Sequence, residues 1–203
     1  MKTMKGSDLS TPSNRKDANQ NTFKVLTAAY KVFAMKGYDA TIEEIANEAG
    51  VGVGTVHRRF SNKTVLATAV VTDIFQKIKE KQLQVVKMDM PADQKIRLLF
   101  EIFSDSHLQY GKIHSLGLHL ATIGELGDEM RASLLTAIEG SVLDIILQGQ
   151  EEELFREGDP KLLELLIINM INPHLILKLK EHVPVEKITE TVSDMILLGL
   201  IKK

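Results

Sequence analysis

The chain has 203 residues, a formal net charge of −2 and a hydrophobic fraction of 44%, which allows one sizeable core and a small second domain. Aromatic residues make up only 5% and prolines number 5, which favours an all-helical protein over a β-sandwich or barrel. The absence of cysteine excludes a disulfide framework and a thiolate zinc site. The start of the chain is polar, unlike a secretory signal, and no apolar run reaches about 18 residues. We therefore expect a cytoplasmic protein with no membrane partner.

Positive charge is concentrated at the start of the chain. Residues 1–70 carry ten Lys and Arg against six Asp and Glu, whereas residues 71–203 carry fifteen against twenty-one. A basic head on an acidic body is typical of a protein that meets phosphate at one end only. Chance variation in surface charge is the alternative explanation.

The first part of the chain predicts a tail followed by a helix. Residues 1–16 lack helical periodicity and contain Gly, Ser and Pro, so we expect a flexible tail. Its basic side chains could reach phosphate groups, and the alternative is a tail that is simply disordered. Apolar residues then recur at helical spacing from about Asp17 to Lys36, and Gly37 ends the pattern. The predicted buried stripe consists of Phe23, Leu26, Thr27, Tyr30 and Phe33 or Ala34.

Residues 41–63 carry the pattern around which the chain is organised. Thr41 is a suitable N-cap and Glu44 follows three residues later, which predicts a capping box and a short helix. Gly50 suits the left-handed residue that ends a helix. The apolar positions are Ile42, Ile45, Ala46 and Ala49 before this glycine and Val53, Val56 and Phe60 after it. Two short helices joined by a sharp turn indicate a helix-turn-helix.

Segment 22–66 also holds a dense set of specific positions: Ala28, Ala29, Phe33, Gly37, Tyr38, Thr41, Ile45, Ala46, Ala49, Gly50, Val51, Gly54, Thr55, Val56, Phe60 and Lys63. With them, the segment resembles the N-terminal DNA-binding domain of TetR-family transcriptional regulators. Beyond this third of the chain the resemblance is one of layout, an all-helical regulatory domain of matching length. His57 stands where the family most often has a tyrosine, and Gly52 stands where a serine often caps the second helix.

The predicted DNA contacts are exposed positions of the second helix and residues beside it. Side chains there can read base edges, and the amides at the helix start can hold a phosphate. The resemblance implies that Lys63 contacts phosphate. The predicted set is Lys36, Thr41, Val53, Gly54, Thr55, His57, Arg58 and Lys63. Arg59 can also face outwards on this helix. An ion pair with Glu44 or Glu48 is an equally weighted alternative for its side chain.

The rest of the chain predicts further helices, about nine in total, and the fold class is all-α. Gly111 is expected to end one helix, and Pro173 is expected to kink or split another. The predicted helix ranges after the helix-turn-helix are 61–87, 91–110, 113–123, 128–157, 161–180 and 184–203. We expect a helix-turn-helix DNA-binding domain over residues 1–65 and a ligand-binding and dimerisation domain over residues 66–203.

A ligand pocket is predicted where glycines interrupt the helices of the second domain. Aromatic and histidine side chains gather in this part of the sequence, and they suit a small hydrophobic or amphipathic effector. Asn169 lies on a later, otherwise apolar helix, where either a pocket or a dimer interface would give it a partner. The predicted residues are Phe100, Phe103, His107, Tyr110, His119, Met130 and Asn169. A metal site on His107, His114 and His119 is the alternative, but the chain has no His-x-x-x-His pair among them. We therefore expect no metal and no cofactor.

The last two helices are more apolar than a solvent-facing surface requires. Their stripes predict a two-fold interface between two copies of the chain, which helix-turn-helix proteins commonly need to span two half-sites. The predicted interface residues are Leu166, Ile188, Val192, Met195, Ile196 and Gly199. The alternative is that these helices complete the core of one monomer.

These patterns predict a homodimeric transcriptional repressor that binds a double-stranded DNA operator and is released from it by a small molecule. A ligand-independent DNA-binding protein is one alternative. An enzyme with its site in the helical body is another, but the sequence has no phosphate loop, nucleophile elbow or metal-ligand pair. We therefore expect a protein that is not an enzyme.

Overall fold

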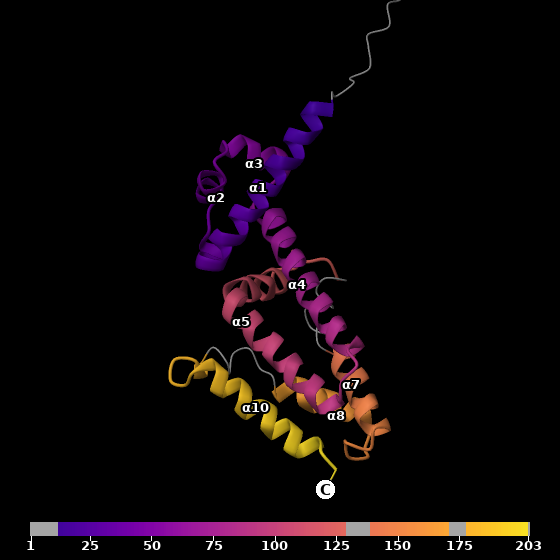
Figure 1. The fold of residues 1–203 in the computed structure, drawn as a ribbon. Coiled ribbons are helices and arrows are strands. Elements are labelled where there is room, and N and C mark those ends of the chain that lie inside the picture. The colour runs from indigo at the N-terminus through magenta and orange to yellow at the C-terminus, as the bar shows by residue number, and fades with distance from the viewer. Residues whose placement is uncertain (1–11, 129–138, 171–177, 203) are drawn as a thin grey trace, which may run out of the picture. The chain divides into compact units, whose positions relative to one another are not determined.

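The computed structural model describes residues 12–128, 139–170 and 178–202 (Figure 1). They form eight α-helices and one 3-10 turn, which confirms the all-α fold. The chain divides into two compact units, residues 1–70 and 71–203, whereas the sequence places the domain boundary at residue 65. The elements are α1 (Pro12–Lys36), η1 (Gly37–Asp39), α2 (Ile42–Ala49), α3 (Val53–Arg59), α4 (Lys63–Lys87), α5 (Ala92–Thr122), α7 (Glu139–Glu151), α8 (Pro160–Met170) and α10 (Val185–Leu200).

In the first unit, α1 packs against α2 and α3. The helix begins at Pro12, earlier than the predicted Asp17, and residues 1–11 of the predicted tail lie outside the described residues. The predicted stripe of α1 is wrong at two positions, because Phe23 and Thr27 are exposed. The buried face instead consists of Val25, Ala28, Ala29, Val32 and Phe33. The small side chains of Ala28 and Ala29 on this face allow another helix to approach closely.

In the second unit, α5 is one helix from Ala92 to Thr122, so the predicted end at Gly111 is wrong. Figure 1 shows that the helix changes direction sharply along its length. A glycine inside a helix costs only about 1 kcal/mol relative to alanine. Burial of Ile113, Leu116 and Leu120 beyond Gly111 outweighs that cost. The helix therefore continues through Gly111 to Thr122.

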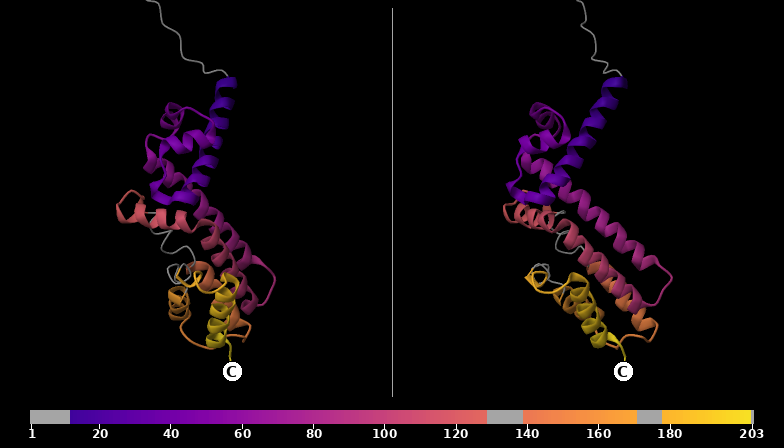
Figure 2. Two further views of the ribbon diagram at one scale, coloured as in Figure 1. Left: turned by 90° about the vertical axis from the view of Figure 1, so that its left-hand side faces the viewer. Right: turned by 60° about the vertical axis from the view of Figure 1, so that its left-hand side comes forward.

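The core of the second unit lies among α5, α7, α8 and α10, and both α7 and α10 pack against α5 (Figure 2). It includes Ala92, Ile96, Leu99, Phe100, Phe103, Val142, Ile145, Ile146, Phe155, Ile167, Ile188, Ile196, Leu197 and Leu200. One lysine, Lys95, is buried beside this core. Its Nζ donates hydrogen bonds to the Val86 carbonyl oxygen (2.7 Å) and to Gln148 Oε1 (2.6 Å), which satisfies the ammonium group at the end of α4.

The ends of α7 and α10 are tied together by backbone hydrogen bonds. The described part of the predicted helix 128–157 ends at Glu151, and the chain then turns through Glu153, which has φ 56°. Arg156 N donates to the Leu200 carbonyl (2.7 Å), and Lys202 N donates to the Leu154 carbonyl (2.9 Å). These bonds stop α7 earlier than helical spacing alone predicts. Residues 171–177, which include Pro173, lie outside the described residues.

No helix in the described parts of the chain combines the length and the apolar character needed to cross a membrane.

Candidate nucleic-acid interface

The first helix of the helix-turn-helix begins at a complete capping box. Glu44 N donates to Thr41 Oγ1 (3.2 Å), and Thr41 N donates to Glu44 Oε2 (3.1 Å). The Glu44 carboxylate also pairs with the Lys36 ammonium. This lysine first, and then the Thr41 amide, lowers the pKa of Glu44 below its usual value. The charged carboxylate therefore fixes the start of α2 at neutral pH.

The turn between α2 and α3 depends on Gly50, which adopts a left-handed conformation with φ 64° and ψ 36°. Its amide donates to the Asn47 carbonyl (3.1 Å), and Val51 N donates to the Ala46 carbonyl (3.0 Å). A glycine takes this conformation without a steric penalty. Ile45, Ala46 and Val56 are buried where α2 and α3 meet, so the turn and the packing together fix the direction of α3.

The opposite face of α3 is open to solvent and carries the predicted reading residues. Val53, Gly54, His57 and Arg58 are exposed, and Thr55 is half-buried. Arg58 is folded back along its own helix: Nη2 donates to Thr55 Oγ1 (3.2 Å) and Nε donates to the Gly54 carbonyl (3.3 Å). These bonds pre-arrange a hydroxyl and a guanidinium group side by side. Both groups can bond to base edges in the major groove.

Lys63, at the start of α4, is held in place by Tyr38. Its Nζ donates to the Tyr38 carbonyl oxygen (2.8 Å) and lies 4.0 Å from the centre of the Tyr38 ring. A lysine ammonium has three donors, so this contact leaves donors for a phosphate. Tyr38 thus positions the lysine, a role that sequence reasoning did not assign to it.

The structure changes the interpretation of two basic residues, Lys36 and Arg59. Lys36 is paired with Glu44, so a phosphate at this site competes with a carboxylate. Arg59 is exposed, and the carboxylates proposed for it have other partners, since Glu48 pairs with Lys31 (2.9 Å). The ion-pair alternative for Arg59 does not occur within the described residues. Arg59 is therefore available for a further phosphate contact, which the basic run His57-Arg58-Arg59 indicates in the sequence.

The residues predicted to line a ligand pocket differ in burial and do not all lie together. Phe100, Phe103 and His107 are buried on α5. Tyr110 is half-buried, whereas His119 and Asn169 are exposed. The Asn169 amide donates to the Leu165 carbonyl of its own helix (2.7 Å). Met130 lies outside the described residues.

His107 is paired with His114. From the sequence, His114 is a possible metal ligand or a residue that borders a pocket. Nδ1 of His114 lies 3.0 Å from Nε2 of His107, and Nδ1 of His107 lies 2.9 Å from the Phe103 carbonyl oxygen. Burial lowers the pKa of both rings, and burial together with the neighbouring His107 lowers that of His114 to about 3. Within the described residues, no group of three or more potential ligands could hold a metal.

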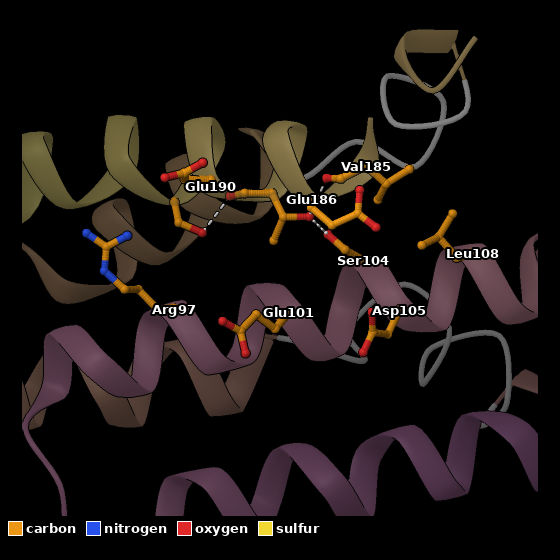
Figure 3. Close-up of a pocket in the computed structure, with 10 residues that line it drawn as sticks. Arg97, Glu101, Ser104, Asp105, Leu108, Val185, Glu186 and Glu190 are labelled. Carbon is orange, nitrogen blue, oxygen red and sulfur yellow. Dashed lines mark hydrogen bonds between the residues drawn. The ribbon is translucent and has the colours of Figure 1, made fainter. Parts of the chain in front are cut away.

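A separate groove of about 380 Å³ lies between α5 and α10 (Figure 3). Its floor includes a hydrogen bond from Thr189 Oγ1 to Ser104 Oγ (2.6 Å). Four of its ten lining residues carry carboxylates; the lining consists of Arg97, Glu101, Ser104, Asp105, Leu108, Val185, Glu186, Thr189, Glu190 and Ser193. This acidic groove shares no residue with the predicted pocket.

The predicted interface residues divide between the core and the surface. Ile188 and Ile196 are buried in the core of the second unit, and Val192 packs against it. Leu166, Met195 and Gly199 are exposed. Leu198, which the sequence prediction omitted, has an exposed fraction of 76%. Apolar spacing alone does not separate the two faces of such a helix, because both carry apolar residues.

Residues 25–70 match the sequence profile described as bacterial regulatory proteins of the tetR family. A protein of Bacillus subtilis (strain 168), described as the uncharacterized HTH-type transcriptional regulator YhgD, is 28% identical over 189 residues, which cover 88% of this chain and 93% of that protein.

The fold is also similar to that of two solved structures. One is a protein from Saccharomonospora viridis in complex with choline, with a TM-score of 0.78 and 18% identity over 93% of this chain and 100% of that chain. The other is the transcriptional regulator FadR from Bacillus subtilis in complex with stearoyl-CoA, with a TM-score of 0.67 and 19% identity over 88% of this chain and 98% of that chain. Residues 25–70 therefore match the tetR-family profile across the helix-turn-helix, and most of the chain is similar to an HTH-type transcriptional regulator.

Proposed function

We propose that the protein is a homodimeric repressor that leaves its operator when a small molecule binds within residues 71–203. The observation that carries this proposal is the exposed face of α3, where Thr55 and Arg58 lie side by side beyond a turn fixed by Gly50. A short helix held in this way can enter the major groove and present its side chains to base edges. Lys63 and Arg59 are the proposed phosphate contacts beside it.

Exposed apolar side chains on α8 and α10 support the proposed dimer. Leu162 and Leu166 on α8 and Met195 and Leu198 on α10 each have an exposed fraction above 50%. Such side chains on two helices are typical of a surface that a partner covers. Two copies related by a two-fold axis would present two α3 helices to half-sites about 34–36 Å apart.

Small-molecule control is proposed by analogy with the two structures of similar fold that were solved with choline and with stearoyl-CoA. An effector can shift the protein between two conformations only if it binds one of them more tightly. We propose that the favoured conformation separates the two α3 helices by a distance that no longer matches one turn of DNA. The operator would then be released.

Selection of binding sites from randomised double-stranded DNA tests the proposed operator. We expect a palindrome whose half-sites are about one helical turn apart. Arg58→Ala should change the preference at specific positions, at a cost of about 1–3 kcal/mol of discrimination. Lys63→Ala should weaken binding equally on all sequences and reduce the salt slope by about one.

Lys77→Ala is the matched control for Lys63→Ala, because Lys77 is an exposed lysine of the same helix paired with Asp73. It should leave both the preference and the salt slope unchanged. Recovery of no palindrome by the unaltered protein would contradict the proposed operator. An operator complex that no component of a cell extract dissociates would instead favour ligand-independent DNA binding.

A further inference from the structure

The two buried histidines of α5 form a hydrogen-bond chain with a fixed direction. The Phe103 carbonyl oxygen can only accept, so Nδ1 of His107 carries the proton of the 2.9 Å contact. A neutral imidazole has one N–H, and Nε2 of His107 is therefore an acceptor. It receives the Nδ1 proton of His114 at 3.0 Å. The chain ends at Nε2 of His114, which must be an acceptor.

This terminal acceptor is buried and has no hydrogen-bond partner among the described residues. His114 has an exposed fraction of 9%. Because its pKa is lowered to about 3, the ring stays neutral at physiological pH and keeps its acceptor. Buried polar atoms are nearly always paired, since an unpaired one costs free energy. The structure therefore calls for a donor at this atom.

Two phenylalanine rings lie beside the histidine pair. The Phe75 ring of α4 lies 5.0 Å from the His114 ring, and the Phe103 ring lies 4.1 Å from the His107 ring. Gln82 is buried on α4, and its Oε1 also has no partner among the described residues. Gln82 follows Phe75 by seven residues, about two helical turns, so both side chains point to the same face of α4. That face presents an aromatic ring and an acceptor.

We infer that His114 Nε2 binds a hydroxyl or N–H group of an otherwise apolar small molecule. This inference rests on the proposed function, in which residues 71–203 bind an effector, and it adds the chemical class of that effector. An ionised carboxylate or phosphate only accepts hydrogen bonds, so it has nothing to donate to this nitrogen. The histidine pair thus selects a donor such as an alcohol or a phenol.

Phenol and anisole are matched probes for this site, because both carry a benzene ring but only phenol has a donor. Protein labelled with ¹⁵N-histidine is titrated with each probe, and the His114 nitrogen resonances are followed. We expect both histidines to be neutral Nδ1–H tautomers, and phenol to shift the Nε2 signal of His114. Phenol should bind about tenfold more tightly than anisole, as expected for one hydrogen bond.

His114→Phe removes the acceptor and keeps a ring of similar size, so it should bind the two probes equally. His119→Gln, at an exposed position of the same helix, should retain the tenfold preference. The inference is overturned if phenol leaves the His114 Nε2 signal unmoved, if neither probe binds, or if the two probes bind the unaltered protein equally.

Operator binding is measured on the same sample. If the palindrome is bound and phenol does not reach His114, the inference fails and the proposed repressor stands. If phenol binds at His114 and no operator is recovered, the proposed repressor fails and the ligand site stands.

Discussion

At the scale of single residues, the hydrogen-bond partners and the burial of polar side chains determine their properties. Arg58 and Lys63 are fixed by contacts with Thr55 and Tyr38, so two flexible side chains lose less freedom when they meet DNA. His107 and His114 are held neutral by burial. Their burial makes them sensitive to acid.

Acid should destabilise the protein through His114. Its pKa is lowered from 6.5 to about 3 in the folded chain, so below pH 6.5 the unfolded state binds a proton that the folded state does not. The stability that the neutral ring contributes is present above pH 6.5 and is lost as the pH falls towards 3. Between pH 7.5 and pH 5 the loss should be on the order of 2 kcal/mol.

Urea unfolding at the two pH values measures this loss. His114→Phe cannot be protonated, so it should reduce the difference between pH 7.5 and pH 5 by roughly that amount, whereas His119→Gln should not. An equal difference in the unaltered protein and in His114→Phe would show that other groups cause the acid sensitivity.

At the scale of elements, the end of α7 shows how one side chain limits a helix. Phe155 folds back over Gly149, and the Gly149 carbonyl accepts hydrogen bonds from Leu154 N (3.0 Å) and Phe155 N (2.9 Å). A β-carbon at position 149 would overlap the Phe155 ring. Phe155 is fully buried, so the ring has little room to move.

Gly149→Ala should therefore destabilise the protein by about 1–3 kcal/mol, as expected for overpacking. Gly140→Ala is the control within the same helix, because a β-carbon there meets no atom within 4 Å. It should be neutral or stabilise the protein by up to about 1 kcal/mol. Thermal or urea unfolding of both variants makes the comparison. If both alanines stabilise the chain, Phe155 does not limit α7.

At the scale of the whole molecule, several apolar side chains of the described helices are exposed. Leu198 is the most exposed of them, and Met195 lies on the same face of α10, three residues before it. Ile188 and Ile196 lie inside the core instead, so a charge at either position would unfold the unit rather than test an interface. Leu198 is the better position for a test of the proposed dimer.

Leu198→Glu should dissociate the proposed dimer, because each copy would bury an unpaired carboxylate at a cost of several kcal/mol per ion. Operator affinity should fall with it. Leu83→Glu, at an exposed leucine of α4, should leave the dimer intact. Sedimentation and operator binding are measured for both variants. A Leu198→Glu protein that remains dimeric at micromolar concentration would place the interface elsewhere.

The sequence by itself determined the helix-turn-helix, because every signal for it is local. The capping box joins residues three apart, Gly50 sets its own backbone conformation, and the buried positions of α2 and α3 follow helical spacing. Such interactions do not depend on distant parts of the chain. The pattern could therefore be read residue by residue.

Only the tertiary structure decided which of several apolar faces is buried. On α1 the chain covers Ala28 and Ala29 and exposes Phe23, and on α10 it covers Ile196 and exposes Leu198. Packing also brings Phe75 of α4 against His114 of α5, with 5.0 Å between the ring centres. The buried face of each helix is determined by contacts between residues far apart in sequence. Helical periodicity alone does not predict such contacts.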